Sequence, residues 1–335
     1  MTSSPRKILY VERKAHEFVS IERVFRQIAS VLKNKYETAF QQVPYGNKIF
    51  DTIRNLLFFR KEKAEIYHIT GHIHYLALLF SPSNTVLTIH DLRFLNTSSK
   101  IKRFVIKKLY LEWPVNRLKY ITAISQQTKN EIVSELNCDE QKIRMIPVPL
   151  IGDLSTKNEK PFDPNCPDIL QIGTMKNKNL FRLCEALEGI SCRLRIIGRL
   201  DDEQKRSLSD HSIDFTNVFD LDDDAIKIEY ENADLITFCS TLEGFGLPII
   251  EAQAFGKPVV TSNIEPMIGT SGRAAILVDP FDWESIREGI KEVISDGELR
   301  SDLIERGRKN AARFAADKVA AEYERLYDEM IANIN

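Results

Sequence analysis

Two carboxylates bracket a stretch of the sequence that also carries two glycines and a proline. Glu243 and Glu251 flank the residues Gly-Phe-Gly-Leu-Pro-Ile-Ile, and apolar runs lie on both sides. A carboxylate accepts hydrogen bonds from paired hydroxyl groups, such as those of a ribose. The stretch is therefore either a binding site or only a turn between a strand and a helix.

The elements predicted around the two glutamates place a helix start between them. Residues 234–239 have the pattern of a buried strand, and residues 249–255 that of a short helix. Gly244 and Gly246 permit backbone angles that other residues avoid, and Pro248 suits a first helical turn. Free backbone N–H groups at such a helix start favour an anion, typically a phosphate.

This arrangement matches the groups of a sugar nucleotide, which offers a sugar, a diphosphate and a ribose in that order. Glu251, about one turn inside the helix, can bind the ribose, and Glu243, on the loop, can reach a polar group further out. A purely structural role explains Glu251 alone, because an acid in a first helical turn favours the helix dipole. It does not explain two glutamates on either side of a phosphate-type loop.

Strand-like runs alternate with helical patterns along the chain, which predicts parallel sheets with helices on their faces. In the first half we predict strands at 7–11, 65–70, 85–90, 120–125 and 142–148, and helices at 20–32 and 126–136. In the second half we predict strands at 169–173, 192–198, 234–239, 258–263 and 274–280, and helices at 178–190 and 201–211. The C-terminal run 317–334 has the pattern of one amphipathic helix.

The predicted fold class is α/β, with two Rossmann-like parallel-sheet domains that face each other across a cleft. The chain has 335 residues, beyond the roughly 250–300 at which single cores stop growing. We predict domains over residues 1–150 and 168–317, a Pro- and Asn-containing linker over 151–167, and packing of helix 318–335 back on the first domain. The cleft is the expected ligand site, outside the carboxyl ends of the strands.

Composition narrows the class of protein. The chain is 43% hydrophobic and 28% charged with a formal net charge of −2, so no general basic excess points to nucleic acid. No apolar run approaches the ~20 residues that span a bilayer, and the N-terminus lacks the pattern of a signal peptide. The five cysteines show no Cys-x-x-Cys spacing, which indicates reduced thiols in a cytoplasmic protein.

The stretch "EGFGLPIIEAQAFGKPVVTSN" resembles the signature of the family-4 retaining glycosyltransferases (glycosyl transferases group 1), which have the GT-B fold. Further segments agree in order over nearly the whole chain, among them "VLTIHDLRFL", "ITAISQQTKNEI" and "ILQIGTMKNKNL". The resemblance implies a hexosyltransferase that uses a nucleoside-diphosphate sugar and a glycan or lipid-linked acceptor. It also implies cell-surface polysaccharide or glycoconjugate synthesis, with no cofactor and no protein-held metal.

The resemblance also assigns roles to residues. It implies that Glu251 binds the donor ribose, that Glu243 contacts the transferred sugar and that Lys178 clamps the diphosphate. His90 is expected to hydrogen-bond the transferred sugar near the reacting bond, so the expected catalytic set is Glu243, His90 and Lys178. The other expected donor-binding residues are Gly173, Thr174, Lys176, Arg199, Gly244, Phe245, Gly246 and Leu247.

Two departures from the family pattern leave alternatives open. Family members often carry an arginine where this chain has Thr174 or Asn177, so the second positive charge falls to Lys176 or Arg199, or to neither if both are solvated surface charges. A Gly-Gly step common in the family is replaced by Val19 and Ser20. Ser20 serves the acceptor or caps the following helix.

Further polar residues are expected on the acceptor side. Asp91 follows His90 in a His-Asp step that matches the family, although a core histidine with a capping aspartate gives the same pattern. His72 and His74 lie after a predicted strand and are assigned to acceptor or donor contact. Together with His68 they suggest a metal site, but no acidic or cysteine ligand is near, so we expect none.

The resemblance implies transfer with retention, in which the acceptor attacks from the leaving-group side and the protein contributes positioning and electrostatic stabilisation. Two alternatives stay open: a non-catalytic nucleotide- or glycan-binding subunit and a sugar-nucleotide epimerase. Segment 98–120 combines Lys and Arg with Tyr110 and Trp113. It is either a solvated basic face or a peripheral contact with an anionic membrane at its inner face.

Overall fold

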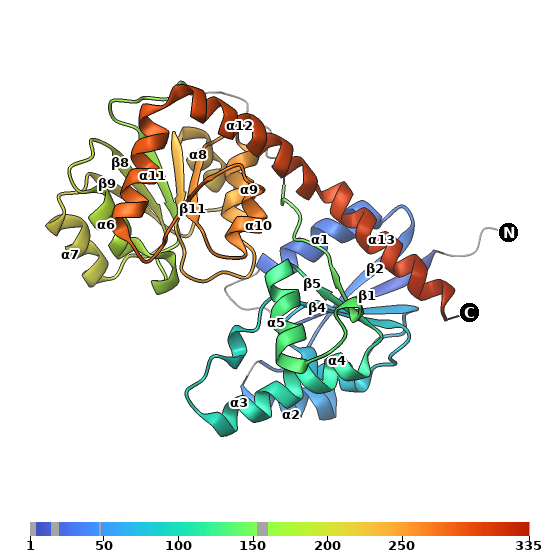
Figure 1. Ribbon diagram of the computed structural model, residues 1–335. Helices are drawn as coiled ribbons and strands as arrows, with labels where there is room; N and C mark the ends of the chain where they lie inside the picture. The colour runs from blue at the N-terminus through green and yellow to red at the C-terminus, as the bar shows by residue number, and fades with distance from the viewer. Residues whose placement is uncertain (1–4, 15–19, 47, 153–159, 335) are drawn as a thin grey trace. The chain divides into compact units, whose positions relative to one another are not determined.

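The computed structural model describes residues 5–14, 20–46, 48–152 and 160–334 (Figure 1). It divides into two compact units. Unit 1 comprises Met1–Ile151 and Ala315–Asn335, and unit 2 comprises Gly152–Phe314. Within these described residues, no helix is both long and apolar enough to cross a membrane.

Unit 1 is built on a six-stranded parallel sheet with the order β2-β1-β3-β4-β5-β6. Strands β3, β4 and β5 are buried along their whole length, as expected when helices cover both faces of a parallel sheet. The strands are β1 (Arg6–Glu12), β2 (Tyr36–Gln42), β3 (Ile66–Ile69), β4 (Thr85–Ile89), β5 (Tyr120–Ala123) and β6 (Ile143–Met145).

Helices of unit 1 connect these strands. The α-helices are α1 (Ser20–Leu32), α2 (Ile49–Phe58), α3 (Lys100–Lys107), α4 (Trp113–Arg117) and α5 (Gln126–Leu136). A π-helical turn, η3 (Lys108–Glu112), joins α3 to α4, and the short 3₁₀ helices are η1 (His74–Leu79), η2 (Arg93–Leu95) and η4 (Glu140–Lys142). Ser125 caps α5 by accepting a hydrogen bond from the Thr128 amide at 3.1 Å.

The C-terminal helix α13 (Ala316–Ala332) completes unit 1. Its buried stripe includes Tyr323, Leu326 and Tyr327, the spacing that the sequence pattern predicts. The Tyr327 hydroxyl lies 2.6 Å from His68 Nδ1 on β3. This helix therefore supplies part of the core of the N-terminal sheet although it stands at the other end of the chain.

Unit 2 has a second six-stranded parallel sheet, ordered β12-β11-β10-β7-β8-β9. Its strands are β7 (Asp168–Ile172), β8 (Arg193–Ile197), β9 (Phe215–Val218), β10 (Leu235–Phe238), β11 (Val259–Ser262) and β12 (Ile276–Val278). Its helices are η5 (Lys176–Lys178), α6 (Leu180–Leu187), α7 (Asp202–Asp210), α8 (Asp223–Asn232), α9 (Leu247–Ala254), α10 (Met267–Ser271), α11 (Trp283–Ser295), α12 (Gly297–Ala311) and η6 (Ala312–Phe314).

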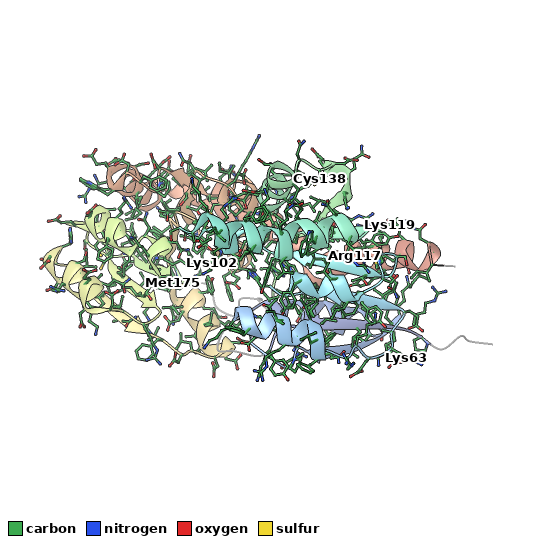
Figure 2. All side chains as sticks on the ribbon, turned by 90° about the horizontal axis from the view of Figure 1, so that it is seen from below. Lys63, Lys102, Arg117, Lys119, Cys138 and Met175 are labelled. Atoms are coloured by element: carbon green, nitrogen blue, oxygen red, sulfur yellow. The ribbon has the colours of Figure 1, made fainter. Side chains whose placement is uncertain are left out.

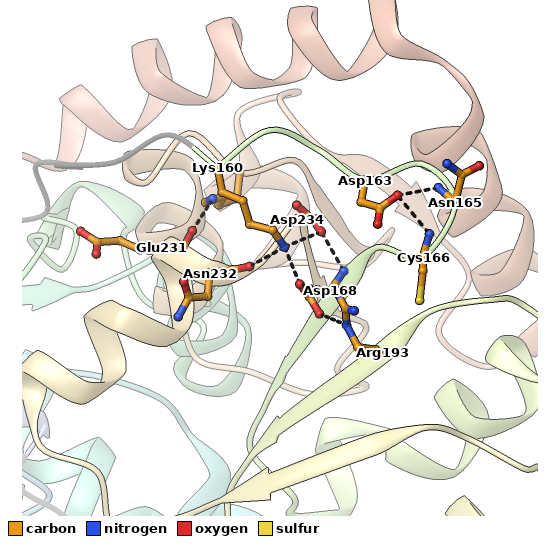
Figure 3. A network of polar contacts seen from close by, with 10 residues as sticks. Lys160, Asp163, Asn165, Cys166, Asp168, Arg193, Glu231, Asn232 and Asp234 are labelled. Carbon is orange, nitrogen blue, oxygen red and sulfur yellow. Dashed lines mark hydrogen bonds and ion pairs between the residues drawn. The ribbon is translucent and has the colours of Figure 1, made fainter.

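A polar network fixes the segment before β7 to unit 2 (Figure 3). Lys160 Nζ contacts carboxylate oxygens of both Asp168 and Asp234, the latter at 3.0 Å, and Arg193 donates to Asp168 at 2.6 Å. These partners lie at the amino ends of the strands. Of the expected linker, residues 160–167 thus belong structurally to unit 2, the boundary between the units falls between Ile151 and Gly152, and residues 153–159 lie outside the described residues.

The predicted fold class is confirmed by the two parallel sheets with their helices. The elements that the sequence analysis did not predict include strands β2 and β9 and helices α2, α8, α10, α11 and α12. The helix predicted from residue 178 begins at Leu180, because Asn179 has a left-handed backbone with φ of 63° and the residues before it form the 3₁₀ helix η5.

Candidate functional site

The carboxyl ends of β7 and β10 lie side by side in unit 2. The two strands pair in parallel, with Thr237 opposite Gln171, so the loops that follow them leave the same edge of the sheet. The loop after β7 contains Lys178, and the loop after β10 contains Glu243. This is the edge at which parallel sheets bind ligands.

Lys178 and Glu243 meet at this edge. Lys178 Nζ lies 2.7 Å from Glu243 Oε1, with both side chains only 12% exposed, and 4.5 Å from the centre of the Phe238 ring. The Asn177 amide donates to the same glutamate oxygen at 3.2 Å and to the Leu242 carbonyl at 2.9 Å. The structure thus brings together two residues that the sequence analysis singled out, 65 positions apart.

Helix α9 begins directly after this loop. Gly246 precedes it with φ of 101°, a left-handed conformation that a side chain disfavours, and no side chain caps the helix start. Pro248 occupies the first turn. The positive end of the helix dipole therefore follows closely after Glu243, and the helix start and the Lys178 ammonium each favour an anion.

The loop residues between the two glutamates differ in exposure. Gly244 and Leu247 are partly exposed, whereas Phe245 is buried against Phe314 with 5.6 Å between ring centroids. Thr270 Oγ1 donates to the Phe245 carbonyl at 2.6 Å. The loop is therefore held in place through its backbone and one aromatic anchor.

Glu251 is held by a buried tyrosine. The Tyr230 hydroxyl on α8 donates to Glu251 Oε2 at 2.7 Å. Tyr230 is 1% exposed and stacks on Phe255, with 5.1 Å between ring centroids and an interplanar angle of 8°. Burial, reinforced by the neighbouring carboxylate, raises the pKa of Tyr230 well above 10, so the hydroxyl keeps its proton and stays a donor.

The two candidates for a second positive charge lie differently. Arg199 is 68% exposed, forms an ion pair with Asp220 and lies 4.3 Å above the Phe219 ring. Lys176 is exposed. Across the residues with described placement, neither side chain forms a hydrogen bond or ion pair with the Lys178–Glu243 pair.

The remaining predicted donor residues shape the loop after β7. Thr174 Oγ1 donates to the Arg199 carbonyl at 2.7 Å, which links this loop to the loop after β8. Gly173 has φ of 88°, and a Cβ there would meet the Lys178 side chain at 3.0 Å. A glycine at this position therefore lets the lysine side chain pass close to the backbone.

In unit 1, His90 lies at the end of β4. Its Nε2 donates to the Thr70 carbonyl at 2.8 Å, which leaves Nδ1 as an acceptor, and burial lowers the pKa of His90 to about 4. Burial tends to raise the pKa of the adjacent Asp91, but hydrogen bonds from Arg93, at 2.8 and 2.9 Å, outweigh it and the pKa is lowered. The pair thus combines a neutral imidazole with a charged carboxylate.

His72 and His74 lie beside this pair. The His72 ring is stacked with His90 at 6.3 Å, and its Nε2 is 4.0 Å from Asp91. His74 is fully buried, and its Nδ1 donates to the Tyr110 carbonyl at 2.8 Å. Burial lowers the pKa of His72 to about 4 and that of His74 to about 3, so both rings are neutral at pH 7.

Three further expectations concern unit 1. His68 is a core residue, since it bonds the Tyr327 hydroxyl and Thr88 Oγ1. Among the residues whose placement is described, no group of three or more His, Cys, Asp or Glu side chains could hold a metal ion. Helix α1 begins at Ser20, but the side chain of Ser20 and all of Val19 lie outside the described residues.

Sequence reasoning missed two residues that position the glutamates, Tyr230 and Asn177. Nothing in the pattern of α8 distinguishes Tyr230 from an ordinary buried aromatic residue. Asn177 had a weak signal, because it directly precedes Lys178 in the same loop.

Comparison with known proteins points to one enzyme family. Residues 154–310, which contain Lys178 and both glutamates, match the family model described as glycosyl transferases group 1. The capsular polysaccharide biosynthesis glycosyltransferase CapM of Staphylococcus aureus is 27% identical over 312 residues, which cover 83% of this chain and 80% of CapM. The O-antigen chain mannosyltransferase RfbU of Salmonella typhimurium is 29% identical over 248 residues, which cover 70% of this chain and 67% of RfbU.

One solved structure illustrates the shared fold. Anabaena Alr3699/HepE, in complex with UDP and glucose, aligns with 97% of this chain and 100% of its own, with a TM-score of 0.75 and 13% sequence identity. At this identity the similarity establishes the fold alone, which is the GT-B fold that the sequence resemblance implies.

Proposed function

We propose that this chain, as a member of the glycosyl transferases group 1, transfers a hexose from a nucleoside-diphosphate sugar to a hydroxyl group, with retention of anomeric configuration. The observation that carries the proposal is the Lys178–Glu243 pair at the carboxyl ends of β7 and β10, next to the start of α9.

The donor fits this site group by group. We assign the diphosphate to the Lys178 ammonium, which is a cation, and to the backbone N–H groups at the start of α9, which carry the partial positive charge of the helix dipole. The ribose hydroxyls bind Glu251, whose carboxylate is oriented by Tyr230. Glu243 contacts the transferred sugar, and when the donor binds, the diphosphate takes over part of the contact that Lys178 now makes with Glu243.

The chemical step needs little covalent participation by the protein. The bond between the sugar C1 and the diphosphate oxygen breaks, and the acceptor oxygen bonds C1 from the same face. The departing phosphate oxygen takes the acceptor's proton. Charge grows on the leaving diphosphate as its bond breaks, so the cation of Lys178 and the helix start stabilise the transition state more than the ground state.

His90 contributes through its neutral ring in this proposal. With Nε2–H bound to the Thr70 carbonyl, Nδ1 is left to accept a hydrogen bond from a sugar hydroxyl. A pKa of about 4 keeps that nitrogen unprotonated throughout the neutral range. The ring thereby orients the sugar without adding a positive charge.

The acceptor class is inferred from the relatives. CapM is named for capsular polysaccharide biosynthesis and RfbU for the O-antigen chain. We therefore assign this chain to the assembly of a cell-surface polysaccharide, with a glycan or lipid-linked acceptor at the cytoplasmic face of the membrane. The hexose and the nucleotide base are to be identified by experiment.

A thermal-shift screen against UDP-, GDP- and ADP-hexoses tests the donor site, since a ligand that binds only the folded chain raises its Tm. We expect one donor class to raise Tm and Lys178→Ala to weaken its binding about tenfold or more, as loss of a charge-assisted contact of ~1.5–3 kcal/mol requires. Lys205→Ala, on the exposed face of α7, is the matched control. Equal donor affinity in Lys178→Ala and wild type contradicts the assignment.

A further inference from the structure

Helix α2 of unit 1 turns its polar side inward. Thr52 and Asn55 are buried and hydrogen-bonded, Thr52 to the Tyr110 hydroxyl at 2.7 Å and Asn55 to the Tyr75 hydroxyl at 2.9 Å. Its apolar side faces outward. The exposed side chains at helical spacing are Phe50 (77%), Ile53 (53%), Leu57 (60%) and Phe58 (57%).

Helix α3 shows a similar exposed apolar stripe. Ile101 is 79% exposed and Phe104 62%, and Val105 lies beside them on the same side. No residue of this helix is buried. An amphipathic helix in a soluble unit normally turns such a stripe toward the core, so this outward orientation requires an explanation.

The two helices belong to one face of unit 1. The Thr52–Tyr110 hydrogen bond joins α2 to η3, which continues α3, and Tyr110 packs on Tyr75 with 5.1 Å between ring centroids. Both helices lie along the same edge in Figure 1, and Figure 2 looks onto that edge, with Lys102 and Arg117 marking the run from α3 to α4. We call the exposed residues of α2 and α3 the α2–α3 surface.

The α2–α3 surface carries positive charge among its apolar side chains. Helix α3 contains four basic residues and no acid, namely Lys100, Lys102, Arg103 and Lys107, and Lys108 follows it at the start of η3. Lys100 and Lys102 are exposed, as is Arg54 on α2, whose guanidinium carbon lies 4.4 Å from the centre of the Tyr45 ring. Glu135 pairs with Arg103 and Lys107, and Glu112 pairs with Lys108.

We infer that the α2–α3 surface docks on an anionic lipid bilayer. Phe, Ile and Leu side chains beside Lys and Arg are what an interfacial helix needs, since the apolar groups enter the headgroup boundary while the cations meet anionic lipid. The apolar stripes and the basic residues are therefore complementary to one and the same surface.

A bilayer fits these charges better than another protein does. In a two-fold contact between copies of the chain, the same patch meets itself, so the lysines of α3 would approach one another. Lysine is also depleted at the core of protein interfaces. An anionic bilayer has neither conflict.

The inference deepens the proposed function and rests on it in one respect, the lipid-linked acceptor. Docking through unit 1 would hold the enzyme at the surface where such an acceptor lies. It also adds α2 to the membrane contact expected for segment 98–120, since four of the seven exposed apolar side chains of the α2–α3 surface belong to α2.

Co-sedimentation of the full chain with phosphatidylcholine vesicles containing about a third phosphatidylglycerol tests the inference, with pure phosphatidylcholine vesicles for comparison. Three variants probe the surface: Ile53→Ser, Phe50→Ser, and the pair Lys100→Gln with Lys102→Gln. Ile228→Ser on α8 of unit 2 is the matched control for Ile53→Ser, because both side chains are 53% exposed. All of these side chains are exposed, so the variants are expected to fold.

We expect wild type to bind the anionic vesicles, to bind phosphatidylcholine weakly and to lose binding as salt rises. The double lysine variant is expected to bind about 30-fold more weakly, from ~1 kcal/mol per cation. Phe50→Ser and Ile53→Ser are each expected to weaken binding severalfold, and Ile228→Ser is expected to change nothing.

Absence of binding to anionic vesicles overturns the inference, and so does equal binding by the surface variants and wild type. Dimerisation of the chain that Phe50→Ser abolishes, without vesicle binding, assigns the surface to a second copy and also overturns it. The assay contains no sugar nucleotide, so failure here leaves the donor thermal-shift result untouched. A chain that binds the donor but not the vesicles therefore supports the proposed donor site and overturns the docking inference.

Discussion

Tyr230→Phe isolates the positioning of Glu251. The substitution removes one hydroxyl and keeps the ring, so the stack on Phe255 at 5.1 Å survives. It deletes a 2.7 Å hydrogen bond to the carboxylate that we assign to the donor ribose. The perturbation therefore acts on the orientation of Glu251 and not on the packing of α8.

The magnitude follows from the environment of the bond. Hydrogen bonds to charged groups contribute ~1.5–3 kcal/mol. Glu251 is partly exposed, so water can replace the lost donor and the lower end applies, about 1.5 kcal/mol of unfolding free energy. If the same bond orients Glu251 for the ribose, the Kd for the donor nucleotide rises up to about tenfold, since tenfold corresponds to ~1.4 kcal/mol.

Isothermal titration with the donor nucleotide and urea denaturation of the same samples give both quantities. Tyr323→Phe is the control, since it removes another buried hydroxyl, 3.4 Å from Thr88 in unit 1, and should leave the donor Kd unchanged. The reasoning is refuted if Tyr230→Phe loses stability yet binds the donor with the wild-type Kd, because the bond to Glu251 then plays no part in recognition.

Three further predictions concern the same units. The unit 1 histidines described above have folded pKa values of about 3–4 against an unfolded value near 6.5. The free energy of unfolding should therefore be full above about pH 6.5 and fall by roughly 1 kcal/mol per histidine by pH 5.5. Urea unfolding, followed by Trp113 fluorescence in a Trp283→Phe background, measures this, and the same midpoint at pH 7.5 and pH 5.5 would contradict it. Gly246→Ala places a Cβ on a residue with φ of 101°, 3.1 Å from Ile249 Cδ1, which strains the backbone by ~1–3 kcal/mol. Both the Tm and the affinity for the donor should therefore fall. An unchanged Tm would argue against a rigid loop. Asn177→Ala removes two hydrogen bonds that hold Glu243 and its loop, so kcat/KM should fall severalfold with little change in Tm. Unaltered kinetics would show that Asn177 does not position Glu243 for the reaction.

Elements with a regular apolar period were predicted well from the sequence. Helix α1 was predicted at its observed bounds, Ser20–Leu32, because its apolar residues repeat at helical spacing over a buried face. Strand β2 was missed because it lies at the edge of its sheet and is only partly buried over most of its length, which weakens the hydrophobic signal. Helix α2 was missed although its apolar residues recur at helical spacing, and its orientation, with Thr52 and Asn55 buried and Phe50 exposed, is the reverse of what such a pattern predicts.

The donor site divides in the same way. In the proposed donor site, Glu243 and Glu251 stood out through the local chemistry of their loop, and Lys178 through the resemblance of its segment to a family motif. The partner of Glu251, Tyr230, comes from a different helix, and only the packing of α8 on the sheet brings the two together. Contacts of this kind depend on tertiary structure and leave no mark in a single sequence.

Release of nucleoside diphosphate from a panel of UDP-, GDP- and ADP-hexoses, by wild type and by Glu243→Gln at equal concentration, tests the central claim most directly. Glutamine keeps the shape of the side chain but removes its charge, so folding should be retained. We expect wild type to consume one donor class, with acceptor or by slow hydrolysis, and Glu243→Gln to lose most of that turnover while it still binds nucleotide. A wild-type chain that binds a donor but turns over none, or a fully active Glu243→Gln, would contradict the account.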